Sequence, residues 1–173
     1  MSIFGSRRKL EPEIVFLEEP IKLAGFAVKT SVKTVFKDIP RLGEKFHLYK
    51  QAKGIPNQTE PKIFVVLSRN FDKKNQSWEC VMANMVKDFE QVPDDLNPYK
   101  IPAGKYAIFT VRPKYKPFEG LTIKRTKDYI TKEWVKNSGY ELTGLDFEYY
   151  NESEMDKRRP EVKLYYGIKE KRV

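Results

Sequence analysis

Alternating apolar and polar positions predict a chain made largely of strands. The strand-like stretches are 13–30, 62–70, 77–86, 101–113, 145–150 and 162–169. The first stretch is long enough for one extended strand or for a strand pair broken near Pro20 and Gly25. Polar turn residues between the second and third stretches are typical of a hairpin. Such alternation favours antiparallel sheets with one buried face.

Helical spacing of apolar residues predicts two helices between these strands. The first follows Asp38, a candidate N-cap, and ends at Gly54. The second runs from Leu121 to Asn137 and is closed by Gly139. The residues expected to face inward are Leu42, Phe46 and Tyr49 in the first helix, and Ile123, Ile130 and Trp134 in the second.

The order of elements is strand, helix, strand, strand, and it occurs twice. The distance in sequence from the helix start near Ile39 to the helix start near Thr122 equals the distance from the strand at Ile63 to the strand at Asp146. This equal spacing indicates an internal duplication. The predicted fold class is α+β: two strand-helix-strand-strand modules related by a pseudo-twofold. Helices would lie on one side of antiparallel sheets, with the opposite side open to a ligand and a cleft between the modules.

The predicted domain organisation is simple. Residues 1–12 are short, basic and weakly patterned, and we expect a loosely ordered tail there. Residues 13–173 form a single domain, with a first module over about 13–92 and a second over about 93–173. No room for a DNA-binding domain is left ahead of Glu13, so we expect a stand-alone module.

Composition narrows the partners. Cys80 is the one cysteine, so no internal disulfide forms, and no apolar run is long enough for a signal peptide or a membrane span; a cytoplasmic location without a membrane partner is expected. The formal net charge of +9 raises the question of nucleic acid. Basic residues in 105–136 and 157–172 are interleaved with acids and carry no DNA- or RNA-binding motif, which favours a solvated surface over a nucleic-acid site.

The strand Asp146–Tyr150 carries the most specific candidate chemistry. Period-two alternation places Asp146, Glu148 and Tyr150 on one face and aromatic residues on the other. A carboxylate among aromatic rings is costly to desolvate unless a cation or a hydrogen-bond donor meets it, so the strand indicates a ligand pocket. A solvated face, with Glu148 as one surface acid among many, is the alternative.

Several motifs in the second half resemble those of the GyrI-like small-molecule-binding domain, which also forms the effector-binding half of AraC-type and multidrug-responsive transcription regulators. An Ile-Pro-Ala-Gly lead opens 101–109, Trp134 and a Ser-Gly-Tyr loop lie in 132–142, and a Phe-Glu-x-Tyr strand follows at 147–150. The resemblance covers roughly 13–169. It implies two modules of the SHS2 type with a pocket between them, and a glutamate, here Glu148, that contacts cationic aromatic ligands.

The predicted ligand is therefore an amphipathic, aromatic small molecule, which is a cation if the charge of Glu148 is available to it. The candidate ligand-binding residues are Glu148, Tyr150, Tyr165, Trp134, Phe109, Phe26, Trp78 and Lys163. Ordinary core packing is the alternative for most of the aromatic residues. If the strands 146–150 and 162–168 pair, Lys163 could reach Glu148 and take the place of a ligand cation, which would favour neutral or anionic ligands instead.

Enzymatic activity stays open at this point. Some proteins similar to this family hydrolyse cyclopropane rings of DNA-alkylating natural products, and Glu148 could be a general base with Glu79, Glu141 or Glu161 as the second acid. Cys80 and His47 could pair as nucleophile and base, although structural roles are favoured for both. No cofactor or metal is expected. A relative named as a gyrase inhibitor raises a third possibility, but no residue here identifies a protein-binding interface.

Overall fold

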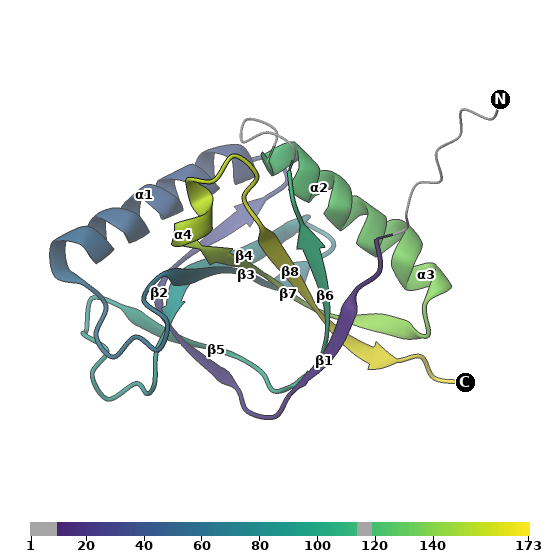
Figure 1. Cartoon of the computed structure of the whole chain (residues 1–173), viewed down its shortest axis with the longest axis horizontal. Coiled ribbons are helices and arrows are strands. Elements are labelled where there is room, and N and C mark those ends of the chain that lie inside the picture. Colours follow the sequence, from purple (N-terminus) through teal and green to yellow (C-terminus); the bar gives the residue numbers. More distant parts are fainter. Residues whose placement is uncertain (1–9, 114–118) are drawn as a thin grey trace.

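The computed structural model describes residues 10–113 and 119–173, and its described strands form one eight-stranded antiparallel sheet (Figure 1). Most of the predicted tail and the end of the loop before the second helix lie outside these residues. The strands are β1 (Glu13–Leu17), β2 (Ile21–Ser31), β3 (Ile63–Asp72), β4 (Ser77–Met85), β5 (Asn97–Ile101), β6 (Gly104–Val111), β7 (Tyr140–Asn151) and β8 (Val162–Glu170). The helices are α1 (Val35–Lys53), α2 (Glu119–Tyr129), the π-helical turn η2 (Ile130–Trp134), α3 (Val135–Asn137) and α4 (Glu152–Met155).

The strand order is β1-β6-β8-β7-β3-β4-β2-β5, with β3 and β7 at the centre. This order is unchanged when it is reversed and each strand is exchanged for the one four positions away in the chain. Strands β2, β3 and β4 form one side of the sheet and β6, β7 and β8 the other, while each edge strand pairs with the opposite half: β1 with β6 and β5 with β2. The chain therefore crosses between the halves at both edges.

Both long helical segments lie on the same side of the sheet (Figure 1). Helix α1 packs on β2 and β4, and the continuous run α2-η2-α3 packs on β6 and β7. Each covers its own apolar cluster: Phe46 lies at the centre of the first, and Ile130 and Phe109 lie in the second. No helix among the described residues is long and apolar enough to cross a membrane.

The face opposite the helices is closed by the sheet itself. Its cluster contains Leu23, Val65, Val81, Tyr106 and Phe147, which come from strands of both halves. The edge strands β1 and β5 curve below this face (Figure 1). The expectation that this side stands open to a ligand is therefore wrong, because a strongly curved sheet buries its concave face against its own side chains.

Most predicted elements are present, with corrections at their boundaries. Helix α1 begins at Val35 rather than after Asp38, whose carboxylate accepts a hydrogen bond from the Thr30 hydroxyl at 2.9 Å. The strand break near Pro20 is confirmed, whereas β2 continues through Gly25. Strand β5 and the short helix α4 were not predicted, because the Pro- and Asn-rich stretch before 101 resembles a loop and α4 is a single turn.

Gly25 marks a close approach of two strands that only glycine permits. A Cβ atom at this position would lie 2.1 Å from the backbone oxygen of Met82 and 2.6 Å from the Cα of Ala83. We predict that Gly25→Ala lowers the free energy of unfolding by about 3 kcal/mol, at the upper end of overpacking costs. The measurement is urea denaturation of both proteins, followed by circular dichroism.

Gly43→Ala provides the matched control. It lies inside α1, where an added Cβ would meet the Met82 side chain at an ordinary 3.6 Å. This variant should be stabilised by about 0.5 to 1 kcal/mol, because alanine is the better helix former. Equal effects of the two substitutions would contradict the close approach at Gly25.

Candidate functional site

A pocket of about 410 Å³ opens between α1 and α2, above the centre of the sheet. Its walls come from α1 (Val35, Ile39 and His47), α2 (Gly120, Ile123 and Lys127) and α4 (Met155), and its floor from β3 (Phe64, Val66 and Ser68), β4 (Trp78, Cys80 and Met82) and β7 (Glu148 and Tyr150). Most of these side chains are apolar or aromatic. A concave, mainly apolar site with a few convergent polar groups is the usual form of a small-molecule pocket.

The pocket exists because two helices cannot cover six central strands. Helix α1 packs over β2 and β4, and the run α2-η2-α3 packs over β6 and β7, so the residues where β3 pairs with β7 are left between the two helical segments. Their pairing joins the halves and places Val66 opposite Glu148 on the pocket floor. Tyr150 contacts the apolar clusters under both helices and therefore lies where the halves meet.

Glu148 lies at the centre of a small polar cluster in this floor. Its Oε1 atom is 2.6 Å from the ammonium of Lys127, and its Oε2 atom accepts a hydrogen bond of 2.5 Å from the hydroxyl of Tyr150. The same ammonium is 3.4 Å from the carboxylate of Asp146. The side chains of Glu148 and Asp146 are 15% and 13% exposed. The solvated alternative for this strand face is thus excluded, since both acids are largely buried and paired.

Burial and charge act against each other at this cluster. Burial alone would lower the pKa of Lys127, but the charges of Glu148 and Asp146 outweigh it and raise the pKa above the ordinary lysine value. Burial raises the pKa of Asp146 in spite of the opposing charge of Lys127. Lys127 is therefore a cation at neutral pH, held in place by two carboxyl groups.

The remaining polar groups of the pocket are uncharged. Burial lowers the pKa of His47, so its imidazole is neutral at pH 7, and burial raises the pKa of the Cys80 thiol to about 12. A thiol with such a pKa is not a thiolate nucleophile at neutral pH. The structure thus brings His47 and Cys80 to one pocket, but without the chemistry of a nucleophile and base pair.

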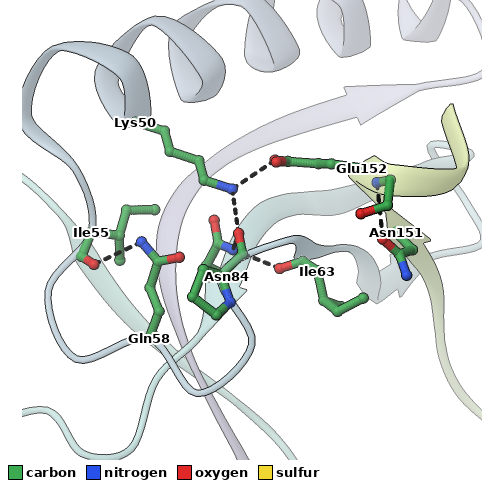
Figure 2. A network of polar contacts seen from close by, with 9 residues as sticks. Lys50, Ile55, Gln58, Ile63, Asn84, Asn151 and Glu152 are labelled. Atoms are coloured by element: carbon green, nitrogen blue, oxygen red, sulfur yellow. Dashed lines mark hydrogen bonds and ion pairs between the residues drawn. The ribbon is translucent and has the colours of Figure 1, made fainter. Parts of the chain in front are cut away.

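A polar network links α1 with α4 and with the residues around the start of β3 (Figure 2). Lys50 of α1 forms an ion pair of 2.6 Å with Glu152 of α4 and donates a second hydrogen bond to the backbone oxygen of Pro61. The buried side chain of Asn84 donates to the backbone oxygen of Ile63 at 2.5 Å. The ion pair joins α4 to α1, and α4 carries Met155 of the pocket wall.

Three of the eight candidate ligand-binding residues line this pocket: Glu148, Tyr150 and Trp78. The other aromatic candidates are packed elsewhere. Phe26 lies beneath α1, edge-on to Tyr49, and Phe109 is fully buried against Trp134 under the second helical segment. Most of these rings are therefore core residues, as expected for large aromatic side chains in general.

Strand register corrects the remaining two candidates. In the β7–β8 pair, Lys163 lies opposite Tyr149 and Tyr165 lies opposite Phe147. Directly paired residues share a face of the sheet, so both candidates lie on the face away from Glu148. The predicted contact between Lys163 and Glu148 is thus not formed, and the cation beside Glu148 is Lys127 instead.

The acids suggested as a second catalytic group also lie outside the pocket. Their ion-pair partners are Arg69 for Glu79, Lys169 for Glu141 and Arg112 for Glu161. The structure therefore gives Glu148 none of the predicted acidic partners.

Lys127 was not among the residues predicted from the sequence, although its spacing indicates an inward position. It follows Ile123 by four residues and precedes Ile130 by three, which places it on the inward stripe of the predicted helix. A lysine at an inward position between apolar residues calls for a buried partner. The acids on the Glu148 face of the strand 145–150 supply it.

Comparison with known proteins now identifies the family. Residues 13–168 match the family described as Cass2, the integron-associated effector binding protein. The chain belongs to this family. Its fold is that of a GyrI-like effector-binding domain, which agrees with the resemblance found in the sequence motifs.

Individual relatives cover almost the whole chain. YobU of Bacillus subtilis (strain 168), classed by its name among transcriptional regulators, is 24% identical over 152 residues, which cover 86% of this chain and 92% of YobU. The integron cassette protein VCH_CASS2 from the mobile metagenome of Vibrio cholerae aligns with a TM-score of 0.64 at 16% identity, over 92% of this chain and 96% of its own. SAV2435 bound to tetraphenylphosphonium aligns with a TM-score of 0.73 at 9% identity, over 92% and 94% of the two chains.

The buried position of Asp146 predicts a dependence of stability on pH. Its pKa is raised above the usual 3.8, so the folded protein binds this proton more tightly than the unfolded chain does. Between 3.8 and the raised pKa, this residue makes the free energy of unfolding fall as the pH rises, by at most about 1.4 kcal/mol per pH unit. Asp146→Asn should remove that decline, as measured by urea denaturation across acidic pH.

Asp128→Asn is the control with the opposite sign. A hydrogen bond from Lys124 holds the pKa of the exposed Asp128 below its usual value, so its stabilising contribution is lost as the pH falls. If Asp146→Asn and Asp128→Asn changed the pH profile in the same direction, the assignment of a raised pKa to Asp146 would be wrong.

Proposed function

We propose that this protein binds amphipathic, aromatic small molecules in the pocket between α1 and α2, with the Glu148 carboxylate as its polar centre. The observation that carries the proposal is a largely buried carboxylate on the floor of a mainly apolar and aromatic pocket of about 410 Å³. That volume lies within the range of ordinary ligand pockets. An apolar body would contact Phe64, Trp78 and Met82, and its polar group would lie beside the polar cluster around Glu148.

The side chains that line the pocket support an aromatic ligand. Trp78 and Tyr150 contribute rings at the floor, and the Phe64 ring stacks on that of Tyr150 at 5.0 Å between centroids. Met82 and Met155 add flexible apolar side chains, which adapt to ligands of different outline. Such walls favour a binder that accepts several related compounds over one that fits a single substrate.

We further infer that the pocket lies on the pseudo-twofold between two strand-helix-strand-strand modules. The symmetric strand order and the repeated spacing of elements in the sequence both support a duplication. A duplicated unit with one helix per half leaves the region of the axis without a covering helix. The pocket position is then a consequence of the duplication.

Family membership supports the same role. The family is described by its effector binding, and SAV2435, which shares the fold, was crystallised with tetraphenylphosphonium, an aromatic cation. A transcriptional regulator among the relatives supports a sensor over a passive carrier. In this proposal, the protein binds a small molecule, and a partner recognises the ligand-bound form.

Replacing the carboxylate tests its role directly. Aromatic compounds that raise the melting temperature of the protein should lose most of that effect in Glu148→Gln, which keeps the shape of the side chain but removes the charge that pairs with Lys127 in the pocket. Glu141→Gln is the matched control, because Glu141 lies on the same strand but is exposed and paired with Lys169. Equal ligand-induced shifts in all three proteins would contradict a site centred on Glu148.

A second measurement separates binding from turnover. The protein is incubated with a cyclopropane-bearing alkylating compound, and the mass of the compound is followed over time. We expect saturable binding with an unchanged mass, since no predicted second acid lies in the pocket to assist hydrolysis. The gain of one water at a catalytic rate, lost in Glu148→Gln, would establish a hydrolase instead.

A further inference from the structure

The pocket carboxylate already has a cation bound to it. One oxygen of Glu148 pairs with the ammonium of Lys127 at 2.6 Å, and the other accepts from Tyr150 at 2.5 Å. Lys127 is carried by α2 and itself lines the pocket. The place where a ligand cation would meet the carboxylate is therefore taken by a group of the protein.

The second carboxyl group holds this cation in position. Asp146 lies 3.4 Å from the Lys127 ammonium on the same strand face as Glu148, yet it does not line the pocket. Lys127 thus bridges a pocket-facing acid and an acid behind it. Two partners make the ammonium costly to move, because any displacement separates buried opposite charges.

What the pocket offers to a ligand is then largely uncharged. Within the described residues, the hydroxyl of Ser68 and the imidazole of His47 line the pocket without a hydrogen bond to another side chain or backbone group. Both can donate or accept one. These groups suit a ligand with a carbonyl, hydroxyl, oxide or ring nitrogen on an aromatic body.

We propose that Lys127 is the specificity-determining residue of this site, an internal counter-ion that makes the pocket select uncharged aromatic compounds over permanent cations. The inference rests on the proposed function, because it assigns the ligand class of that same pocket. A permanent cation must either displace Lys127 from both carboxyl groups or bind beside its ammonium against like-charge repulsion. An uncharged ligand meets neither obstacle.

Two probes of similar shape and different charge test this assignment. Tetraphenylphosphonium is a permanent cation, and triphenylphosphine oxide is an uncharged compound with one hydrogen-bond acceptor on three phenyl rings. Their dissociation constants are measured by isothermal titration calorimetry at pH 7 and fixed ionic strength. The measured quantity is the ratio of the two constants, which cancels changes that affect both probes equally.

The variants are Lys127→Met, which keeps length and apolar volume, and Lys124→Met as the matched control. Lys124 lies on the same helix but is exposed and paired with Asp128. We expect wild type and Lys124→Met to prefer the uncharged probe. Lys127→Met should shift the ratio toward the cation by about tenfold or more, because the freed carboxylate attracts it. A ratio unchanged in Lys127→Met, or a wild type that prefers the cation, overturns the proposal.

The double variant Lys127→Met/Asp146→Asn separates pairing from net charge and also covers a single variant that fails to fold. It removes one positive and one negative charge, so the formal charge of the site equals that of wild type. It leaves no buried lone carboxylate except the one that faces the pocket. A shift toward the cation in this protein supports the role of Lys127 as counter-ion, and a wild-type ratio overturns it.

Gly120→Trp tests whether ligands bind in this pocket at all, separately from the role of Lys127. Gly120 lines the pocket, and a Cβ atom added there meets nothing within 4 Å, so the bulky ring can be accommodated while narrowing the site. Gly139→Trp is the control outside the pocket, with the same free space at Cβ. Binding that survives unchanged in Gly120→Trp contradicts the proposed function, whereas binding lost there with no charge preference in wild type contradicts only the role of Lys127.

Discussion

The antiparallel pairing of β3 with β7 is the interaction on which the rest of this structure depends. It runs from Ile63 opposite Asn151 to Ser68 opposite Asp146 and turns two smaller sheets into one. Without it, β3 and β7 would each have one unpaired edge, and each half would expose part of an apolar face. With it, the two helices are held apart by the width of the joined strands. The same ladder sets Glu148 in register with Val66, and so decides which side chains form the floor between the helices.

The charge of Glu148 is stabilised in this floor by two partners, one from the strand and one from the helix. A carboxylate in an apolar pocket would take up a proton or remain hydrated if it stood alone. Tyr150 supplies a donor from two residues along the same strand, and Lys127 supplies a cation from the helix above. The ion pair also links α2 to β7, so the position of the helix and the electrostatics of the pocket are set together. Neither could change without the other.

The secondary-structure elements and the strand face that carries Glu148 could be predicted from the sequence, whereas most of the residues that line the pocket could not. Alternation at 145–150 was enough to place Glu148 and Tyr150 together, because a strand has only two faces. The role of Lys163 could not be predicted correctly, since its face depends on the register of β7 with β8, and one residue of register exchanges the faces. The sequence indicates that large aromatic residues are packed in the interior, but it does not indicate which of them border a cavity. Phe109 is fully buried in the core, whereas Trp78 lines the pocket.

The location of the pocket itself depended on a property that local patterns do not carry. The curvature of the sheet closes the face opposite the helices, and curvature arises from the twist accumulated over all eight strands and from edge strands that pair with the other half. The side opposite the helices was therefore wrongly expected to be open. Because the pocket lies on the helical side of the sheet, the inward-facing Lys127 of α2 lines it. The sheet supplies the carboxylate, and the helix above it supplies the lysine that pairs with it. In the proposed site, this division would allow a single helical position to alter the charge preference of the pocket while the sheet beneath it stays unchanged.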